Sequence, residues 1–253
     1  MRQRLRYIFR FGEDRRKFVR QVGSVVLGVL IALGISEIAE EIRWNVRTNA
    51  SERAIDAELA LAAGVFDERV RVQPCLDRRL EDVRLLIAEA RRTGRLPQIG
   101  TIGRPPTRPF SRAAWDVATG SGVTLHMDEA RAAELANSYA QMSGFPDEVE
   151  EEQMLWASLR ALENAPGPVS DDLLATAATT IGFLQFRSML NGINARQQLD
   201  FIQARGIAPD YRLLSDRAFA ADRPFSEREM VTGLRARPIC GRLAVDRGTS
   251  PAG

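Results

Sequence analysis

Two cysteines and one histidine are the side chains of this sequence best suited by type to chemistry. Cys75 and Cys240 are its only cysteines, and His126 is its only histidine. In an oxidising compartment an isolated cysteine pair often forms a disulfide. Here it would close a loop of about 165 residues and contribute roughly 4–5 kcal/mol in the chain-entropy model. We predict this disulfide; two unpaired buried thiols are the alternative if the compartment is reducing.

A catalytic or metal-binding role for His126 has little support in the surrounding sequence. Asp128 and Glu129 are near enough for a mixed His-carboxylate site, but a single histidine cannot build a multi-histidine site. A Ser-His-Asp triad would also depend on this residue, and no G-x-S-x-G motif supplies its serine. His126 precedes an expected helix start, so we interpret it as a capping or surface residue.

Acidic side chains could form a glycoside-hydrolysing pair. They cluster at expected helix starts, where carboxylates stabilise the positive end of the helix dipole: Glu148, Glu150, Glu151, Glu152, Asp171 and Asp172. The sequence also lacks a P-loop, a G-x-G-x-x-G fingerprint and a C-x-x-C pair. We therefore expect no catalytic residues, no cofactor and no metal ligands, and a protein that is not an enzyme.

An uncharged apolar run near the N-terminus predicts a membrane anchor. Residues 22–36 contain no charge, and extending the run to residues 22–39 approaches the roughly 20 residues that cross a bilayer. Arg20 can snorkel to the headgroups on one side, and Glu37 would lie near the opposite interface. A cleaved signal peptide and a buried soluble helix are the alternatives. We favour a retained transmembrane helix because no A-x-A cleavage site follows and the helical pattern continues past the run.

The charges flanking this run predict its orientation. Residues 1–21 hold eight basic and two acidic residues, a net charge of +6, whereas the whole chain carries only +2. Positive flanks stay on the cytoplasmic side; the residues that set topology would be Arg10, Arg15, Arg16, Lys17 and Arg20. We expect the protein to be anchored in a bacterial inner membrane. Its basic tail would be cytoplasmic, either as an amphipathic helix on membrane lipids or as a disordered segment. The following domain would be periplasmic and slightly acidic, which argues against nucleic acid as a partner.

A stripe of small side chains recurs every four residues within the predicted span. It consists of Ser24, Gly28, Ala32 and Ser36. Small residues on one face allow two transmembrane helices to approach closely. A homodimer formed through this helix is therefore one expected partner arrangement, beside an unidentified envelope protein.

Apolar periodicity beyond the anchor predicts an all-α domain over residues 40–246. We expect the transmembrane helix to continue into one long helix with a weak point at Asn49 and Glu52, where a capping box could restart it, and an end or kink at Pro74. The further helices are expected at 76–93, after Ser111, at 128–143, 146–164, 170–205 and 226–236. Residues 94–109 read as a Pro/Gly-rich loop, residues 247–253 as a disordered tail, and no strand is expected.

Aromatic residues within these helices are interpreted as packing residues. Trp44, Trp115 and Trp156 are expected to be core or interface anchors. Phe183, Phe186, Met189 and Leu190 lie close together on one helix, and we expect them in the core rather than around a ligand.

Several segments form a loose pattern: the apolar run 25–33 followed by acidic residues and tryptophan, the stretch 73–80, and Ala114-Trp115-Asp116 with Ser121-Gly122 and His126-Met127. This pattern, from residue 18 to about 205, resembles a group of uncharacterised single-pass inner-membrane proteins of proteobacteria. The resemblance implies an anchored helical periplasmic domain of unknown function and assigns no catalytic residue.

Two functions remain in view. The favoured one is a membrane-anchored periplasmic module with a structural or protein-interaction role; the alternative is a ligand-binding or sensing bundle without its own cytoplasmic output domain. An exposed apolar stripe would favour the first, and a pocket lined by convergent polar groups would favour the second.

Overall fold

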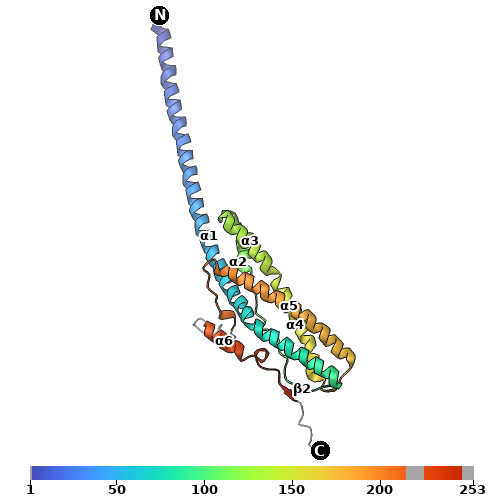
Figure 1. Ribbon diagram of the computed structural model, residues 1–253. Coiled ribbons are helices and arrows are strands. Elements are labelled where there is room, and N and C mark those ends of the chain that lie inside the picture. Colours follow the sequence, from blue (N-terminus) through green and yellow to red (C-terminus); the bar gives the residue numbers. More distant parts are fainter. Residues whose placement is uncertain (1, 215–224, 247–253) are drawn as a thin grey trace, which may run out of the picture.

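The computed structural model describes residues 2–214 and 225–246, with side chains described from residue 18 onward; the expected tail at 247–253 lies outside these residues. The fold is all-α, as predicted: a long N-terminal helix leads into a helical bundle (Figure 1). The helices are α1 (Arg2–Thr93), α2 (Ala113–Gly120), α3 (Glu129–Ser143), α4 (Phe145–Leu159), α5 (Asp171–Gln203) and α6 (Glu227–Arg235). Short 3-10 segments are η1 (Val123–His126), η2 (Arg160–Asn164), η3 (Arg212–Leu214) and η5 (Pro238–Cys240).

Helix α1 is continuous over 92 residues, which at 1.5 Å per residue is about 140 Å. The expected restart at Asn49 and Glu52 is therefore wrong. The helix does not end at Pro74 either, so the separate helix predicted over 76–93 is the last part of α1. Proline inside a helix costs about 3 kcal/mol, because it lacks an N–H and crowds the preceding turn. Val72 and Leu76, on either side of Pro74, are completely buried. Their packing offsets that cost and keeps the helix intact.

Four short strands occur where none was expected. β1 (Arg95–Leu96) pairs with β3 (Gly167–Pro168), and β2 (Gln98–Ile99) pairs with β4 (Val245–Asp246), both antiparallel. Leu96 and Ile99 are buried. The Pro/Gly-rich segment after α1 is therefore fastened to the end of the bundle by two small ladders.

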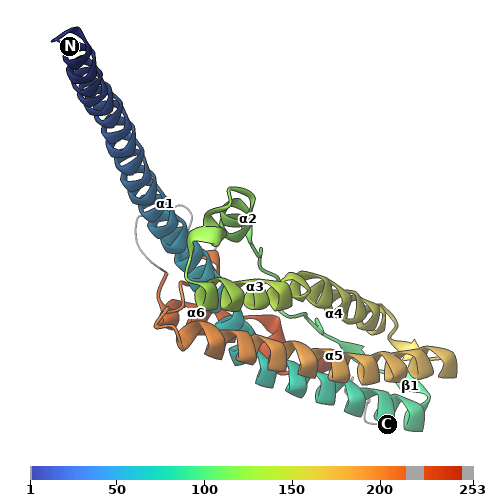
Figure 2. The same ribbon diagram turned by 90° about the horizontal axis from the view of Figure 1, so that it is seen from above.

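The bundle is built around α1 and α5, which lie side by side. Figure 2 shows α3 and α4 following one another along α5. Local capping explains where the later helices begin. Ser170 Oγ accepts a hydrogen bond from Leu173 N–H at the start of α5, and Ser226 forms a capping box with Glu229 at the start of α6. These starts match the sequence prediction.

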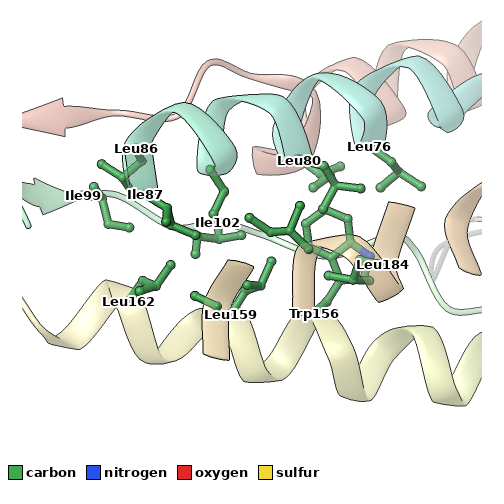
Figure 3. Packing of buried hydrophobic residues seen from close by; sticks show 14 of the residues in the cluster. Leu76, Leu80, Leu86, Ile87, Ile99, Ile102, Trp156, Leu159, Leu162 and Leu184 are labelled. Carbon is green, nitrogen blue, oxygen red and sulfur yellow. The ribbon is translucent and has the colours of Figure 1, made fainter. Parts of the chain in front are cut away.

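Two large apolar clusters divide the interior along α1, and a smaller third one joins Val65 of α1 to Leu214 and Met230. The proximal cluster lies nearer the N-terminal apolar segment and includes Ile55, Leu59, Phe66, Trp115 and Tyr139. The distal cluster lies toward the far end of α1 and is drawn in Figure 3; it includes Leu76, Leu80, Trp156, Leu159 and Leu184. Trp115 and Trp156 are buried, as predicted.

Candidate functional site

The N-terminal part of α1 presents an apolar surface that nothing in the described chain covers. A window of this helix has a mean hydropathy of 2.2 and is 0% buried, and it is the one candidate membrane span found among the described residues. Phe18, Leu30 and Ile38 are each more than half exposed. A long apolar N-terminal helix of this kind could cross a membrane.

The other residues predicted to act in the membrane lie on this same helix. Ser24, Gly28, Ala32 and Ser36 are part of α1, and a Cβ built on Gly28 meets no atom within 4 Å. The stripe is therefore open in the single chain. Arg10, Arg15, Arg16 and Lys17 stand on its helical backbone, with side chains outside the described part, and Arg20 is exposed. Because α1 begins at Arg2, the basic segment is helical rather than disordered.

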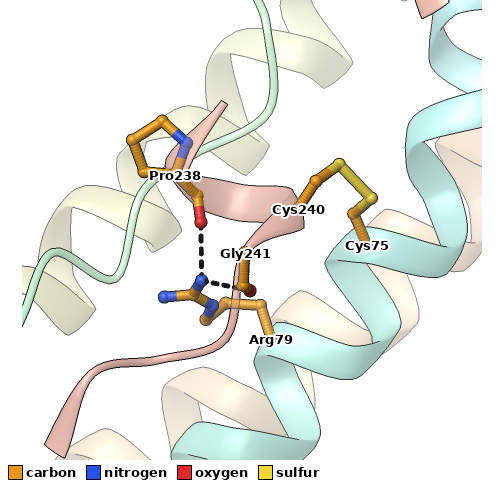
Figure 4. Close-up of a disulfide and its surroundings, with 5 residues drawn as sticks. All are labelled: Cys75, Arg79, Pro238, Cys240 and Gly241. Atoms are coloured by element: carbon orange, nitrogen blue, oxygen red, sulfur yellow. Dashed lines mark hydrogen bonds between the residues drawn. A yellow bond between two sulfur atoms is a disulfide. The ribbon is translucent and has the colours of Figure 1, made fainter. Parts of the chain in front are cut away.

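The predicted disulfide is present. Cys75 and Cys240 are joined with an S–S distance of 2.07 Å and a Cα–Cα distance of 4.7 Å. One helical turn further along α1, Arg79 is 1% exposed. It donates to the carbonyl oxygens of Pro238 and Gly241 at 2.7 and 2.9 Å (Figure 4). It also donates to the carbonyl oxygen of Thr101 at 2.9 Å. A covalent bond and a charged side chain thus fasten the C-terminal segment to α1.

A polar layer separates the two apolar clusters. Arg69, which is 7% exposed, donates from Nη2 to Glu152 Oε1 at 3.1 Å and to the carbonyl and hydroxyl oxygens of Ser188. Glu152 also accepts from Asn191 Nδ2 at 2.8 Å. Burial lowers the pKa of Arg69, an effect that Glu152 opposes. Residues of α1, α4 and α5 are thereby joined through charged and amide groups inside the bundle.

A cavity of about 310 Å³ opens beside this layer. Its walls come from α1, from the loop 104–110 and from the start of α4. Apolar groups include Val65, Phe110 and Phe145, and the charged groups are Glu68, Arg69, Arg104, Arg108, Glu150 and Glu152. The cavity therefore combines apolar walls with convergent charges.

The outer face of α5 differs from the prediction. Phe183, Phe186 and Met189 are between 48% and 60% exposed, so their predicted place in the core was wrong, whereas Leu190 of the same predicted set is half-buried. Ile193, which is 45% exposed, lies with the three exposed residues. The inward positions of α5 are instead occupied by residues that include Leu184, Ser188 and Asn191. Successive helix residues are separated by about 100°, which places the four apolar side chains on the side facing away from α1. We call these four residues the α5 stripe.

The remaining candidates have structural roles. The His126 ring is exposed, which agrees with a surface residue, and it stacks on the half-buried ring of Trp44 with ring centroids 3.8 Å apart. Asp128 caps α3 by accepting from Arg131 N–H. Glu148 accepts from Asn194, Glu151 pairs with Arg187, and Asp171 and Asp172 stand in the first turn of α5. Among the described residues no group of three or more acidic, cysteine or histidine side chains could hold a metal ion.

Sequence reasoning missed Arg69, Arg79 and the buried carboxylate Glu58. Glu58 accepts from Tyr139 Oη at 2.8 Å, from Ser111 Oγ and from Ala114 N–H, and so holds α2 and α3 against α1. The two arginines carried a signal. Each stands seven residues from apolar residues that belong to the core face of α1, where a charge calls for buried partners.

No protein-family model, curated protein or solved structure matches this chain.

Proposed function

We propose that this protein is a membrane-anchored helical module that binds a partner protein through the α5 stripe. The observation that carries the proposal is the exposure of two phenylalanines, a methionine and an isoleucine along one helix. Each half-exposed phenylalanine offers roughly 100 Å² of apolar area, and Met189 and Ile193 add to it. Together they approach the largest apolar patch of a typical monomer, which is often functional.

The spacing of the stripe indicates the kind of surface that would cover it. Phe183, Phe186, Leu190 and Ile193 follow the three-four spacing of a coiled-coil seam. Leu190 is half-buried beside the stripe. An apolar helix face is the natural complement, since its side chains can pack between those of α5. A stripe of this area would form the centre of an interface of about 800 Å² per partner, with a polar rim around it.

The second part of the proposal concerns the orientation of the protein in the membrane and its compartment. The N-terminus would be cytoplasmic, because the basic residues precede the apolar segment, and the bundle would lie in the periplasm of a bacterium. The Cys75–Cys240 disulfide supports an oxidising compartment. The small-residue stripe of the transmembrane helix would add a contact between two copies, and the absence of a catalytic constellation in the sequence supports a non-enzymatic role.

Topology is the first test. Reporter fusions are placed after residue 21 and after residue 250 of the membrane-inserted chain. Activity of the C-terminal fusion only in the periplasm is the expected result. A cytoplasmic C-terminus would overturn the orientation and the compartment together.

The partner surface is tested by photocrosslinking in native membranes. A photoreactive residue replaces Phe183, and in a matched protein it replaces Gln185, which is exposed on the same helix but outside the stripe. We expect a discrete crosslinked product from position 183 that Phe186→Ser removes, and none from position 185. Equal products at both positions, or none at either, would contradict an interface on the α5 stripe.

A further inference from the structure

The cavity beside the polar layer has the form of a small-molecule site. Its volume of about 310 Å³ falls at the lower end of the range for ligand pockets. Three separate segments enclose it, so it is a feature of the folded bundle and not of one loop. Pro105, Phe110, Phe145 and Val149 give it apolar walls.

The strongest pointer to a ligand is the buried guanidinium of Arg69 in the cavity lining. Its Nη2 has three acceptors. Its Nε and Nη1 are buried and have no hydrogen-bond partner among the described residues. Leaving such donors unpaired is unfavourable, and more so when the group is charged. Buried donors of this kind are normally satisfied by water, an ion or a ligand.

Glu68 and Arg104 are further charged groups in the lining of the cavity. Glu68 is neutralised by Arg108, whose Nε and Nη2 both donate to it at 2.6 Å, and Arg237 lies 4.0 Å from it. Arg104 is exposed and donates to Gln153 at 3.2 Å, with no carboxylate partner in the described chain.

Glu150 is the remaining carboxylate, and it is exposed and without a described partner. The three arginines and three glutamates of the lining therefore sum to zero. The positive charge of Arg104, which has no carboxylate partner among the described residues, can compensate one negative charge of a ligand. Each further negative charge would lack a counter-charge in this lining.

We infer that this cavity binds a small monocarboxylate with an apolar body. The carboxylate would accept hydrogen bonds from the exposed Arg104, since charged donors and carboxylates form the stronger hydrogen bonds of proteins. It would also lie near the positive charge of Arg69 in the cavity wall. The apolar body would occupy the space between the loop prolines and the two phenylalanines. The site lies on different residues from the α5 stripe, so either proposal can fail without the other.

The test is an isothermal calorimetric titration of the purified full chain in detergent micelles. The ligands are 4-phenylbutyrate, octanoate and phenylalanine. We expect saturable binding of at least one carboxylate. 4-Phenylbutanol, which has the same body as 4-phenylbutyrate without the charge, would measure partition into the micelle and should bind the protein about tenfold more weakly or worse. Arg104→Gln should weaken the carboxylate by a similar factor, whereas Arg92→Gln, which lies outside the cavity, should not.

Three results would overturn the inference. They are the absence of saturable binding by all three probes, equal binding of 4-phenylbutyrate and 4-phenylbutanol, and binding that Arg104→Gln leaves unchanged. Val149→Trp is a second variant, because an indole placed at the cavity wall would occupy the apolar space and should abolish binding. Far-ultraviolet circular dichroism of each variant verifies that the bundle remains folded.

Discussion

The distal half of the bundle contains a covalent link, whereas the proximal half is joined by hydrogen bonds between buried side chains. In the distal half, Cys75–Cys240 and Arg79 fasten the C-terminal segment over an apolar cluster. In the proximal half, the described residues include no disulfide, and Glu58 connects α1 to α2 and α3 through three donors. The bundle is therefore stabilised by different means on the two sides of its polar layer.

This difference indicates which half can respond to a binding event. A disulfide stabilises a fold mainly by restricting the unfolded chain, and as a covalent bond it persists when nearby side chains shift. The Glu58 contacts depend on geometry, and each is lost when a helix moves by little more than one ångström. The cavity opens beside the polar layer and shares Arg69 and Glu152 with it. Movement of α3 and α4 relative to α1 would therefore break hydrogen bonds of the proximal half first.

The largest expected effect is the loss of the disulfide. Replacing both cysteines, with Cys75→Ser and Cys240→Ser, should lower the free energy of unfolding by about 4–5 kcal/mol, since the bond closes a loop of 165 residues. Urea unfolding of the full chain in detergent, followed by tryptophan fluorescence, measures the change. Hydrogen exchange should rise in β4 and η5 while α3 remains protected. A change below about 1 kcal/mol would show that the non-covalent contacts already hold the segment.

The polar layer gives the next largest effect. Glu152→Gln removes the carboxylate that faces Arg69 and should cost about 3–5 kcal/mol, because the guanidinium would remain buried without its counter-charge. Glu151→Gln is the matched control on the same helix: its exposed pair with Arg187 should contribute less than about 1 kcal/mol.

A second variant separates charge from packing at this position. Replacing both partners, with Arg69→Met and Glu152→Met, should recover most of the loss, since apolar side chains of similar volume need no partner. If the double variant is as unstable as the single one, the layer contributes through shape and amide contacts rather than through its ion pair.

Much of this fold was predictable from periodicity and helix-start signals. The helices at 129–143 and 171–203 and the disulfide all follow from local pattern or composition. The continuity of α1 past Pro74 was not predictable, because it depends on packing of the turns on either side. The four short strands were missed for a similar reason: two residues have no period, and each strand is defined by a partner far away in sequence.

Helix α5 shows most clearly where pattern reasoning fails. Apolar residues occur almost all round this helix, so the sequence does not say which side faces α1. Burial of aromatic side chains was the natural expectation. The structure places Ser188 and Asn191 inside, where Arg69 and Glu152 supply their partners, and leaves Phe183 and Phe186 outside. The residues that contact this face come from α1 and α4, far away in the sequence, so the orientation cannot be predicted from α5 alone.

Paired truncations in the two clusters test whether the halves unfold separately. Leu80→Ala in the distal cluster and Leu59→Ala in the proximal cluster remove side chains that are at most 1% exposed, and each should cost about 2–5 kcal/mol. If the polar layer separates two cooperative units, hydrogen exchange will increase mainly in the half that carries the substitution. A uniform increase after either substitution would mean that the bundle unfolds as one unit and that the layer is not a boundary.

The smallest expected change in stability is on the outer face of α5. Phe186→Ser should alter the free energy of unfolding by no more than about 0.5 kcal/mol, because a side chain that is 59% exposed loses little packing. Leu184→Ala, two residues earlier and completely buried, should cost about 2–5 kcal/mol. Urea unfolding of both variants makes the comparison on one helix. A loss above about 1 kcal/mol for Phe186→Ser would mean that the stripe already packs within its own chain, which would remove the basis for a partner at this surface.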